Sequence, residues 1–319
     1  MSETLIIVVS IFGLIGLGYL TVRIGLLSNA VGERLTEFVF TLAIPLLLFK
    51  TLATADFHGV SPWRIWAAYF LSFAIVWVAS HLMVVRVFRR DGRAGIVAGV
   101  SASYSNSVLI GIPLIQATLG DQGTVFLVII IAVHTAVMML VSVLLNEWIV
   151  AAGKMADAAT SRREALRRLV VSLSTHPMLI GIAAGLLWRA TGLAIPRVVA
   201  AVVDPLANSA GALALFASGT ALVNYGIARQ IRPAIAISAL KLALLPVLVF
   251  GASHAIGLPP IGVAALTLTA ACPTGVNAYL IATRLGTGEA LASNTVLIST
   301  GAGVATVTLW LAILQRTLG

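Results

Sequence analysis

Two short polar segments interrupt long apolar stretches of this 319-residue sequence. Residues 101–113 read SASYSNSVLIGIP, and residues 271–279 read ACPTGVNAY. Proline removes a backbone donor and glycine tolerates irregular dihedral angles, so both segments are expected to unwind and leave backbone groups unpaired. Unpaired groups are tolerated within a membrane only beside a cavity. One such break in each half of the chain predicts a binding site near the bilayer midplane, where half-helix N-termini attract an anion.

The candidate binding residues are the polar side chains and the helix breakers of these two segments. Hydroxyl and amide groups donate hydrogen bonds to a carboxylate, whereas proline and glycine expose the backbone. An alternative is a pair of kinked helices whose polar side chains merely bond to neighbouring helices. The pairing of the two breaks favours the binding site. Its predicted members are Asn106, Asn277, Ser105, Ser107, Thr274, Gly111, Pro113, Pro273 and Gly275.

Ionisable residues within apolar stretches form a second group of candidates. Lys241 lies about eight residues, or ~12 Å, into such a stretch, too deep for an ordinary surface charge. It either contributes a positive charge and a titratable proton to transport or snorkels along its own stem toward the cytoplasm. Asp204, which precedes Pro205, fits a coupling acid or an interfacial helix-start residue. His134 fits a proton relay or a simple bond to a neighbouring helix.

The composition argues against a soluble enzyme. Hydrophobic residues make up 60% of the chain and charged residues 10%, whereas about a quarter of a soluble domain is charged. No H-x-x-x-H, E-x-x-H or G-x-S-x-G motif is present, and the one cysteine, Cys272, excludes an intramolecular disulfide and a thiolate metal cluster. We therefore expect no enzyme activity, no metal and no cofactor. The net charge of +9 is divided among short pieces between apolar stretches, which indicates membrane orientation rather than nucleic-acid binding.

Hydropathy predicts an all-α membrane protein with ten transmembrane helices, because spans of roughly 20 residues allow about ten crossings in this length. The predicted units are residues 1–152 with helices one to five, a basic cytoplasmic loop at 153–168, and residues 169–319 with helices six to ten. The predicted spans lie at residues 5–27, 35–53, 65–85, 94–119, 124–150, 169–193, 198–223, 233–256, 261–285 and 290–314.

Charge and symmetry predict how these helices are oriented. Every second connection holds most of the lysines and arginines, so the positive-inside rule places both termini outside. An odd number of spans per half means that homologous halves must be inverted relative to each other. Leu-Ile at 114–115 and Leu-Gly at 119–120 recur with the same spacing at 280–281 and 285–286. We therefore predict two inverted five-helix repeats.

Residues 106–114, NSVLIGIPL, followed by Gly120, resemble the fourth-helix motif of the auxin efflux carrier family. Residues 273–277, PTGVN, with Tyr279 and Ala282, resemble the ninth-helix motif of its bacterial members. The resemblance covers essentially the whole chain. The family includes the plant PIN-FORMED carriers and bacterial permeases for malonate, malate and similar acids.

The resemblance implies a fold like that of bile-acid symporters and sodium/proton antiporters. In that fold broken helices four and nine cross in a moving domain, beside a scaffold that often forms a homodimer. The resemblance also implies that Asn106 contacts the substrate, and we expect Lys241 to supply the positive charge that sodium supplies in related carriers. The plant motifs have proline where this chain has Ser105 and Ala278, which argues against a plant-type indole substrate.

The expected function is secondary transport across the bacterial inner membrane, the plasma membrane of such a cell. The substrate is expected to be a small organic anion, either a mono- or dicarboxylate or an auxin-like acid, moved by alternating access. Proton coupling, sodium coupling and uniport all remain open from the sequence. The alternative is a membrane sensor or channel that binds the same class of ligand without coupled transport.

Overall fold

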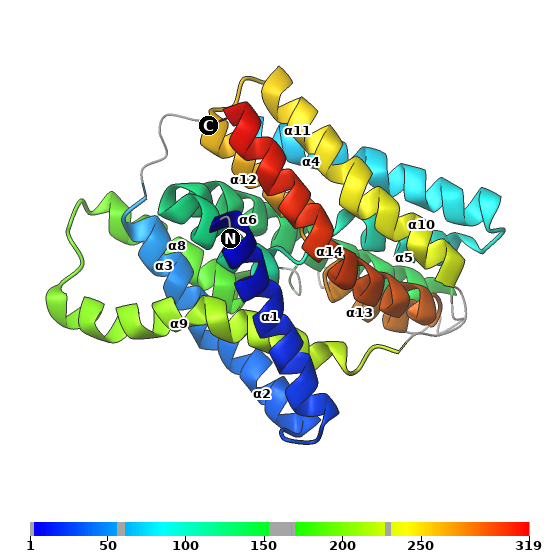
Figure 1. The fold of residues 1–319 in the computed structure, drawn as a ribbon, viewed down its shortest axis with the longest axis horizontal. Coiled ribbons are helices and arrows are strands. Elements are labelled where there is room, and N and C mark those ends of the chain that lie inside the picture. The colour runs from blue at the N-terminus through cyan, green and yellow to red at the C-terminus, as the bar shows by residue number, and fades with distance from the viewer. Residues whose placement is uncertain are drawn as a thin grey trace.

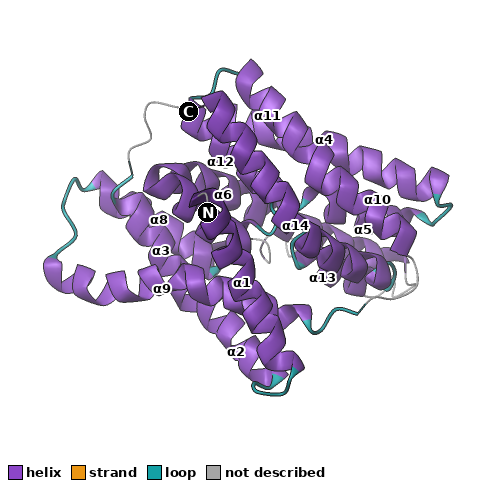
Figure 2. Cartoon of the chain, in the orientation of Figure 1, coloured by secondary structure: helices purple, strands orange, loops and turns teal. Residues whose placement is uncertain are grey.

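The computed structural model describes residues 3–55, 61–152, 167, 170–171, 173–226 and 231–318. Every regular element in these ranges is a helix (Figure 1; Figure 2). Most of the predicted basic loop at 153–168 lies outside the described residues. The helices are α1 (Glu3–Arg23), α2 (Asn29–Phe38), η1 (Val39–Ala43), α3 (Ile44–Ala53), α4 (Pro62–Leu82), η2 (Met83–Val87), α5 (Gly92–Ser103), η3 (Ser107–Gly111), α6 (Ile112–Ala152), α8 (Pro177–Ala190), α9 (Arg197–Leu222), α10 (Ile231–Ala239), η5 (Leu240–Leu244), α11 (Leu245–Ala255), α12 (Pro260–Ala271), α13 (Asn277–Leu285) and α14 (Glu289–Leu318).

Long apolar helices dominate the described part of the chain. Seven helices within the described residues are long and apolar enough to cross a membrane: Leu5–Arg23, Asn29–Ala53, Pro62–Val87, Ser107–His134, Arg197–Leu222, Ile231–Ala255 and Glu289–Leu318. Two further apolar helices, Pro177–Ala190 and Pro260–Ala271, are shorter. An all-helical protein built to span a membrane is therefore confirmed.

The helices are interrupted at the two predicted places. After α5 ends at Ser103, η3 begins only at Ser107, and after α12 ends at Ala271, α13 begins only at Asn277. A further break lies within α6 at Gly120, whose φ of 64° and ψ of −159° are not helical. Glycine is suited to this position because a positive φ is strained for other residues. α6 therefore consists of two helices that meet at a kink.

Three π-helical turns precede a proline at the same spacing. η1, η3 and η5 each end two residues before a proline, at Pro45, Pro113 and Pro246 respectively. The proline ring removes one backbone donor and clashes with the carbonyl one turn earlier, so a widened turn relieves the clash. These prolines shape the site directly, because η3 follows the first interruption and η5 contains Lys241.

The helices pack into two groups. The first helix group, α1, α2, α3, α8 and α9, lies on one side of Figure 1, and the second, α4, α5 and α10 to α14, occupies the other. η3 and α6 contact both groups. Within the first group α1 and α9 touch backbone to backbone, because a Cβ at Gly18 would overlap the Phe216 carbonyl and one at Gly219 would overlap the Ile15 carbonyl. Small residues of this kind permit close helix contacts in membranes.

Candidate functional site

The two interrupted segments cross and pair with each other. Ser105 and Thr274 form an isolated antiparallel bridge. The backbone N–H of Asn106 donates to the Pro273 carbonyl at 2.8 Å, and that of Gly275 donates to the Tyr104 carbonyl at 2.9 Å. Each break thus satisfies backbone groups that the other has lost from its helix, as a non-helical segment within a membrane requires. We call this pairing of residues 104–107 and 272–277 the crossover.

Hydrogen bonds to two neighbouring helices fix the second strand of the crossover. The Thr274 hydroxyl donates to the Ser101 carbonyl at 2.8 Å, and the Thr274 N–H donates to the Ser299 hydroxyl of α14 at 3.0 Å. Ser101 lies in the last turn of α5, where carbonyls have no helical partner. Thr274 therefore serves as a cap for α5 as well as a member of the crossover.

Lys241 reaches the first strand of the crossover from η5. Its side chain is 0% exposed, and Nζ donates to the Ser105 hydroxyl at 2.7 Å and to the Ala270 carbonyl at 2.6 Å. The Tyr69 hydroxyl donates to the same Ser105 oxygen at 3.3 Å. Arg34–Glu37 and Lys50–Asp204 are ion pairs of the described residues, and neither includes Lys241. Lys241 thus has hydrogen-bond acceptors among the described residues but no carboxylate.

Asn106 and Asn277 occupy the starts of the two second half-helices. Asn106 is buried, and its side-chain oxygen accepts a 3.3 Å hydrogen bond from the Leu109 N–H, so that it caps η3. Asn277 begins α13, is partly exposed, and faces the hydroxyl of Tyr104. Ser107 is buried and donates to the Ser105 carbonyl at 3.3 Å. The three residues lie where half-helix N-termini present backbone N–H groups.

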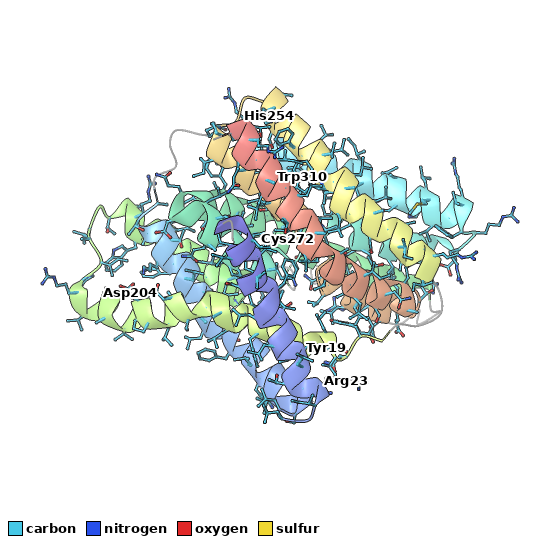
Figure 3. The ribbon with its side chains drawn as sticks, viewed as in Figure 1. Tyr19, Arg23, Asp204, His254, Cys272 and Trp310 are labelled. Carbon is cyan, nitrogen blue, oxygen red and sulfur yellow. The ribbon has the colours of Figure 1, made fainter. Side chains whose placement is uncertain are left out.

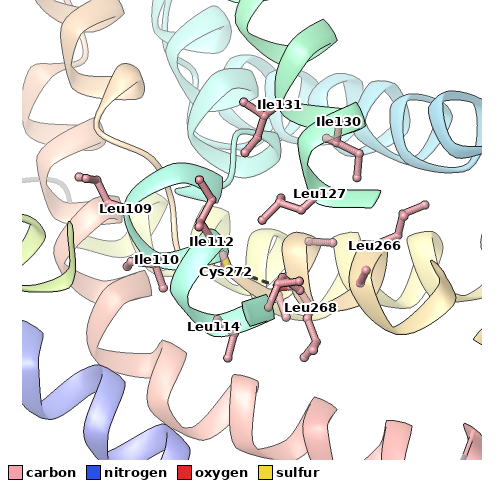
Figure 4. Close-up of a cluster of buried hydrophobic side chains, with 14 of the residues drawn as sticks. Leu109, Ile110, Ile112, Leu114, Leu127, Ile130, Ile131, Leu266, Leu268 and Cys272 are labelled. Atoms are coloured by element: carbon pink, nitrogen blue, oxygen red, sulfur yellow. Dashed lines mark hydrogen bonds between the residues drawn. The ribbon is translucent and has the colours of Figure 1, made fainter. Parts of the chain in front are cut away.

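The predicted glycines and prolines bring backbone segments into contact. A Cβ at Gly275 would lie 2.9 Å from the Tyr104 ring, and Gly111 lies within ordinary contact of Ser107 and Cys272. Pro113 meets Gly211 of α9, and Pro273 meets Gly303 of α14. Apolar side chains of η3, α6 and α12, among them those labelled in Figure 4, pack closely beside the crossover. The polar groups of the crossover are therefore embedded in hydrophobic packing.

His134 of α6 adjoins the crossover through an aromatic cluster. Its ring centroid lies 4.2 Å from that of Tyr104, and rings of Tyr69, Phe70 and Phe73 surround it at 5.4 to 5.8 Å. His134 is 2% exposed, and its Nε2 has no hydrogen-bond partner among the described residues. Neither predicted role is tested by this position: among the described residues, none bonds to Nε2 as a neighbouring helix or a proton relay would.

Asp204 lies away from the crossover. Figure 3 places it on α9 toward one end of the molecule, whereas Cys272 of the crossover lies near the centre. Its carboxylate is 2.9 Å from Nζ of Lys50 on α3. Lys241 and Asp204, the two predicted coupling candidates, are therefore not brought together. The coupling role of each stays a prediction.

Comparison with known proteins shows the family to which the chain belongs. A family described as "Membrane transport protein" matches residues 4–311. The chain is 31% identical over 323 residues to a "Putative malonate transporter" of Rhizobium meliloti, covering 97% of this chain and 95% of the relative. It is 23% identical over 313 residues to "Auxin efflux carrier component 8" of Arabidopsis thaliana, covering 83% and 85%. The chain belongs to the auxin efflux carrier family of membrane transport proteins.

An archaeal relative extends the family likeness. An "Uncharacterized transporter" of Methanothermobacter thermautotrophicus is 23% identical over 313 residues, covering 96% of this chain and 97% of the relative. This auxin efflux carrier family member is therefore a membrane transporter and not an enzyme.

Within the described residues, no three His, Cys, Asp or Glu side chains converge as metal ligands would.

Some residues of this carrier's site cannot be predicted from the sequence. Ser299 and Tyr69 contact the crossover from helices that are distant in the chain, whereas Ser101 belongs to the predicted segment but contributes its backbone carbonyl. The Ala270 carbonyl, which accepts from Lys241, is freed because α12 ends one residue later. The sequence predicts the break after α12, and a helix that ends there leaves its last carbonyls without intrahelical hydrogen-bond donors. That break is the feature of the sequence that could have indicated a donor such as Lys241 nearby.

Proposed function

We propose that this carrier is a secondary transporter that moves a small organic anion, a mono- or dicarboxylate, by alternating access. The proposed binding site is the crossover, where Asn106, Asn277, Ser105, Ser107 and Thr274 offer hydrogen-bonding groups. The observation that supports this most strongly is the position of Lys241, buried beside Ser105 without a carboxylate partner among the described residues.

A buried ammonium favours an anionic ligand for a simple electrostatic reason. Taking a charge out of water costs several kcal/mol unless an opposite charge or strong hydrogen bonds compensate. Ser105 and Ala270 supply neutral acceptors, which leave the positive charge itself uncompensated. A substrate carboxylate at the crossover adds the missing negative charge. The hydroxyl and amide groups then fix its orientation, and the surrounding apolar packing strengthens the attraction.

We propose the full ten-helix, inverted-repeat architecture for this chain. Gly120 ends the helix that follows the first break, and Gly286 ends α13 after the second. Their φ angles are 64° and 63°. These two glycines belong to the Leu-Gly pairs that recur with the same spacing in the two halves. Their ψ angles differ, at −159° and 25°, so what the two positions share is a glycine with a positive φ that ends a helix. This shared feature at corresponding positions supports two homologous units, residues 1–152 and 169–319.

The division into two helix groups supports a moving domain and a scaffold. We assign the first helix group, locked by the Gly18 and Gly219 contacts between α1 and α9, as the scaffold. The second helix group, which contains Lys241 and both strands of the crossover, is assigned as the moving domain. A homodimer through the scaffold, a location in the bacterial inner membrane and termini on the outer side complete the proposal.

We propose that Lys241 makes a bound sodium ion unnecessary, or that its own proton is the ion coupled to transport. The ammonium takes the place that sodium has in related carriers, and loss of its proton would couple flux to pH. Asp204 remains a second candidate for coupling. Uniport corresponds to a lysine that keeps its proton throughout the cycle.

Uptake into proteoliposomes tests the proposed function. The purified chain is reconstituted, and labelled malonate, malate, lactate and indole-3-acetate are offered with a pH gradient, a sodium gradient or no gradient. Saturable uptake of one carboxylate above that of empty vesicles is expected. Its response to each gradient identifies proton coupling, sodium coupling or uniport. Binding of the same acids without any flux would instead indicate a sensor.

A further inference from the structure

A second charged cluster lies outside the crossover, where α3 packs against α9. Nζ of Lys50 is 2.9 Å from Oδ1 of Asp204 and 3.4 Å from Oδ1 of Asn208. The Lys50 and Asp204 side chains are 34% and 43% exposed. Both lie in helices apolar enough to span the membrane. Lys50 lies in the last turn of α3, and a charged side chain near the end of such a helix faces water rather than lipid, so this pair can be reached from the water at that end of the helix.

One face of α9 leads from this pair toward the start of α6, just beyond the crossover. Asp204, Asn208 and Gly211 follow each other at helical spacing, so they lie on the same face of α9 over ~10 Å. At the far end of this face, a Cβ on Gly211 would lie 3.3 Å from the Cβ of Pro113. Pro113 follows the η3 turn that Asn106 caps. A carboxylate beside Lys50 is thus about two helical turns along α9 from Pro113, which follows Asn106 of the crossover by seven residues.

Lys50 has the chemistry of an entry site for an anion. A partly exposed ion pair contributes little net stability, so a second carboxylate can replace that of Asp204 at small cost. The side-chain oxygen of Asn208 accepts a hydrogen bond from Lys50. The side-chain NH₂ group of an asparagine is a donor, so that of Asn208 can donate to an incoming carboxylate. Lys241, by contrast, is fully buried.

We propose that Lys50 is an entry subsite that binds the substrate's carboxylate before it reaches the crossover, with Asp204 as the counter-ion that the substrate displaces. This inference rests on the proposed transport of an organic anion. It assigns Lys50 and Asn208 as substrate-binding residues. It also gives Asp204 a role as a competitor of the substrate rather than as a binding residue.

Two single substitutions with opposite expected effects test the proposal. In counterflow of labelled malonate, or of whichever acid of the panel the wild type carries, Lys50→Gln is expected to raise KM roughly fivefold. Asp204→Asn is expected to lower KM by a similar factor, because Lys50 loses its competing carboxylate. Maximal rates should change little. Counterflow requires no ion gradient, so a coupling role for Asp204 would appear separately, as lost gradient-driven uptake.

The control is another ion pair of the same helix group. Arg34→Gln removes the Arg34–Glu37 pair of α2, joined at 2.7 Å, and is expected to leave KM unchanged. A pair that only holds α3 to α9 would give changes of the same sign in Lys50→Gln and Asp204→Asn, together with equal losses of melting temperature. That result overturns the entry subsite, as does a wild-type KM in Lys50→Gln. Transport of none of the acids by the wild type would refute the proposed function and the entry subsite together.

Discussion

The ammonium of Lys241 donates a 2.7 Å hydrogen bond to the hydroxyl of Ser105, so that a fully buried cation meets the strand where two interrupted helices cross. η5 brings the lysine there because Pro246 widens the preceding turn. The Ser105–Thr274 bridge then connects the lysine to the second break. A positive charge, hydroxyls and helix N-termini are thereby gathered at one place in the interior of the protein.

The first prediction concerns the charge of Lys241. Lys241→Met keeps an unbranched side chain of similar length but removes the ammonium, and we expect it to reduce carboxylate transport by at least about tenfold. Lys241→Arg should retain partial activity because it keeps the charge. Uptake is measured at several pH values, with the amount of folded protein checked by gel filtration. Normal transport by Lys241→Met at every pH would refute the role of the charge.

Thr274 is predicted to stabilise the crossover through its hydroxyl. Thr274→Val preserves the shape of the side chain but leaves the Ser101 carbonyl without its donor, which should cost about 1–3 kcal/mol. We expect a lower melting temperature in detergent and a lower transport rate. Thr274→Ser should recover most of both. Thr308→Val is the control, because Thr308 is partly exposed and its hydroxyl donates to the Val304 carbonyl of its own helix. Equal losses in Thr274→Val and Thr308→Val would contradict the assignment.

The contact between α1 and α9 is predicted to tolerate no side chain at Gly219. The added methyl of Gly219→Ala meets the backbone of Ile15, which cannot rotate away, so we expect destabilisation of about 1–3 kcal/mol. Gly13→Ala is the matched control on α1, because a Cβ there meets nothing within 4 Å and alanine favours a helix. Melting temperatures compare the two variants. Equal stability would mean that the helices can separate at this contact without cost.

His134 is predicted to reduce the stability of the protein. Its Nε2 is buried without a partner among the described residues, a state that costs about 1–3 kcal/mol. His134→Phe keeps the ring in the aromatic cluster and removes the unpaired nitrogen, so we expect a higher melting temperature. Phe73→His, which would add a second polar ring to the same cluster, should lower it. A decrease in the first variant would show that His134 makes a stabilising bond in the membrane.

Local features of the sequence account for much of this fold. The breaks near Ser105 and Thr274 were predictable because proline, glycine and small polar residues disrupt a helix wherever they gather. Lys241 was recognisable because an unbroken apolar stretch surrounds it. The same reasoning identified the family from the residues around Asn106, which the comparison confirmed.

Contacts between distant parts of the chain could not be predicted in this way. Asp204 was a coupling candidate from its depth alone, and nothing local indicated Lys50, whose partner Asn208 is 158 positions away in the chain. The support of Thr274 by Ser299 has the same cause, since α14 follows the second break and returns beside it. Hydropathy likewise gives the length of a helix but not which helices pack together, and it did not reveal the two helix groups.

The central claim is that a carboxylate binds at the crossover and is carried across, and counterflow with Asn106→Ala tests it most directly. Vesicles loaded with unlabelled substrate are placed in a trace of labelled substrate, and accumulation is followed for the wild type, Asn106→Ala and the control Arg34→Gln. We predict transient, saturable accumulation by the wild type and by Arg34→Gln, and its loss in a stably folded Asn106→Ala. Undiminished counterflow by Asn106→Ala would contradict the placement of the substrate at the crossover.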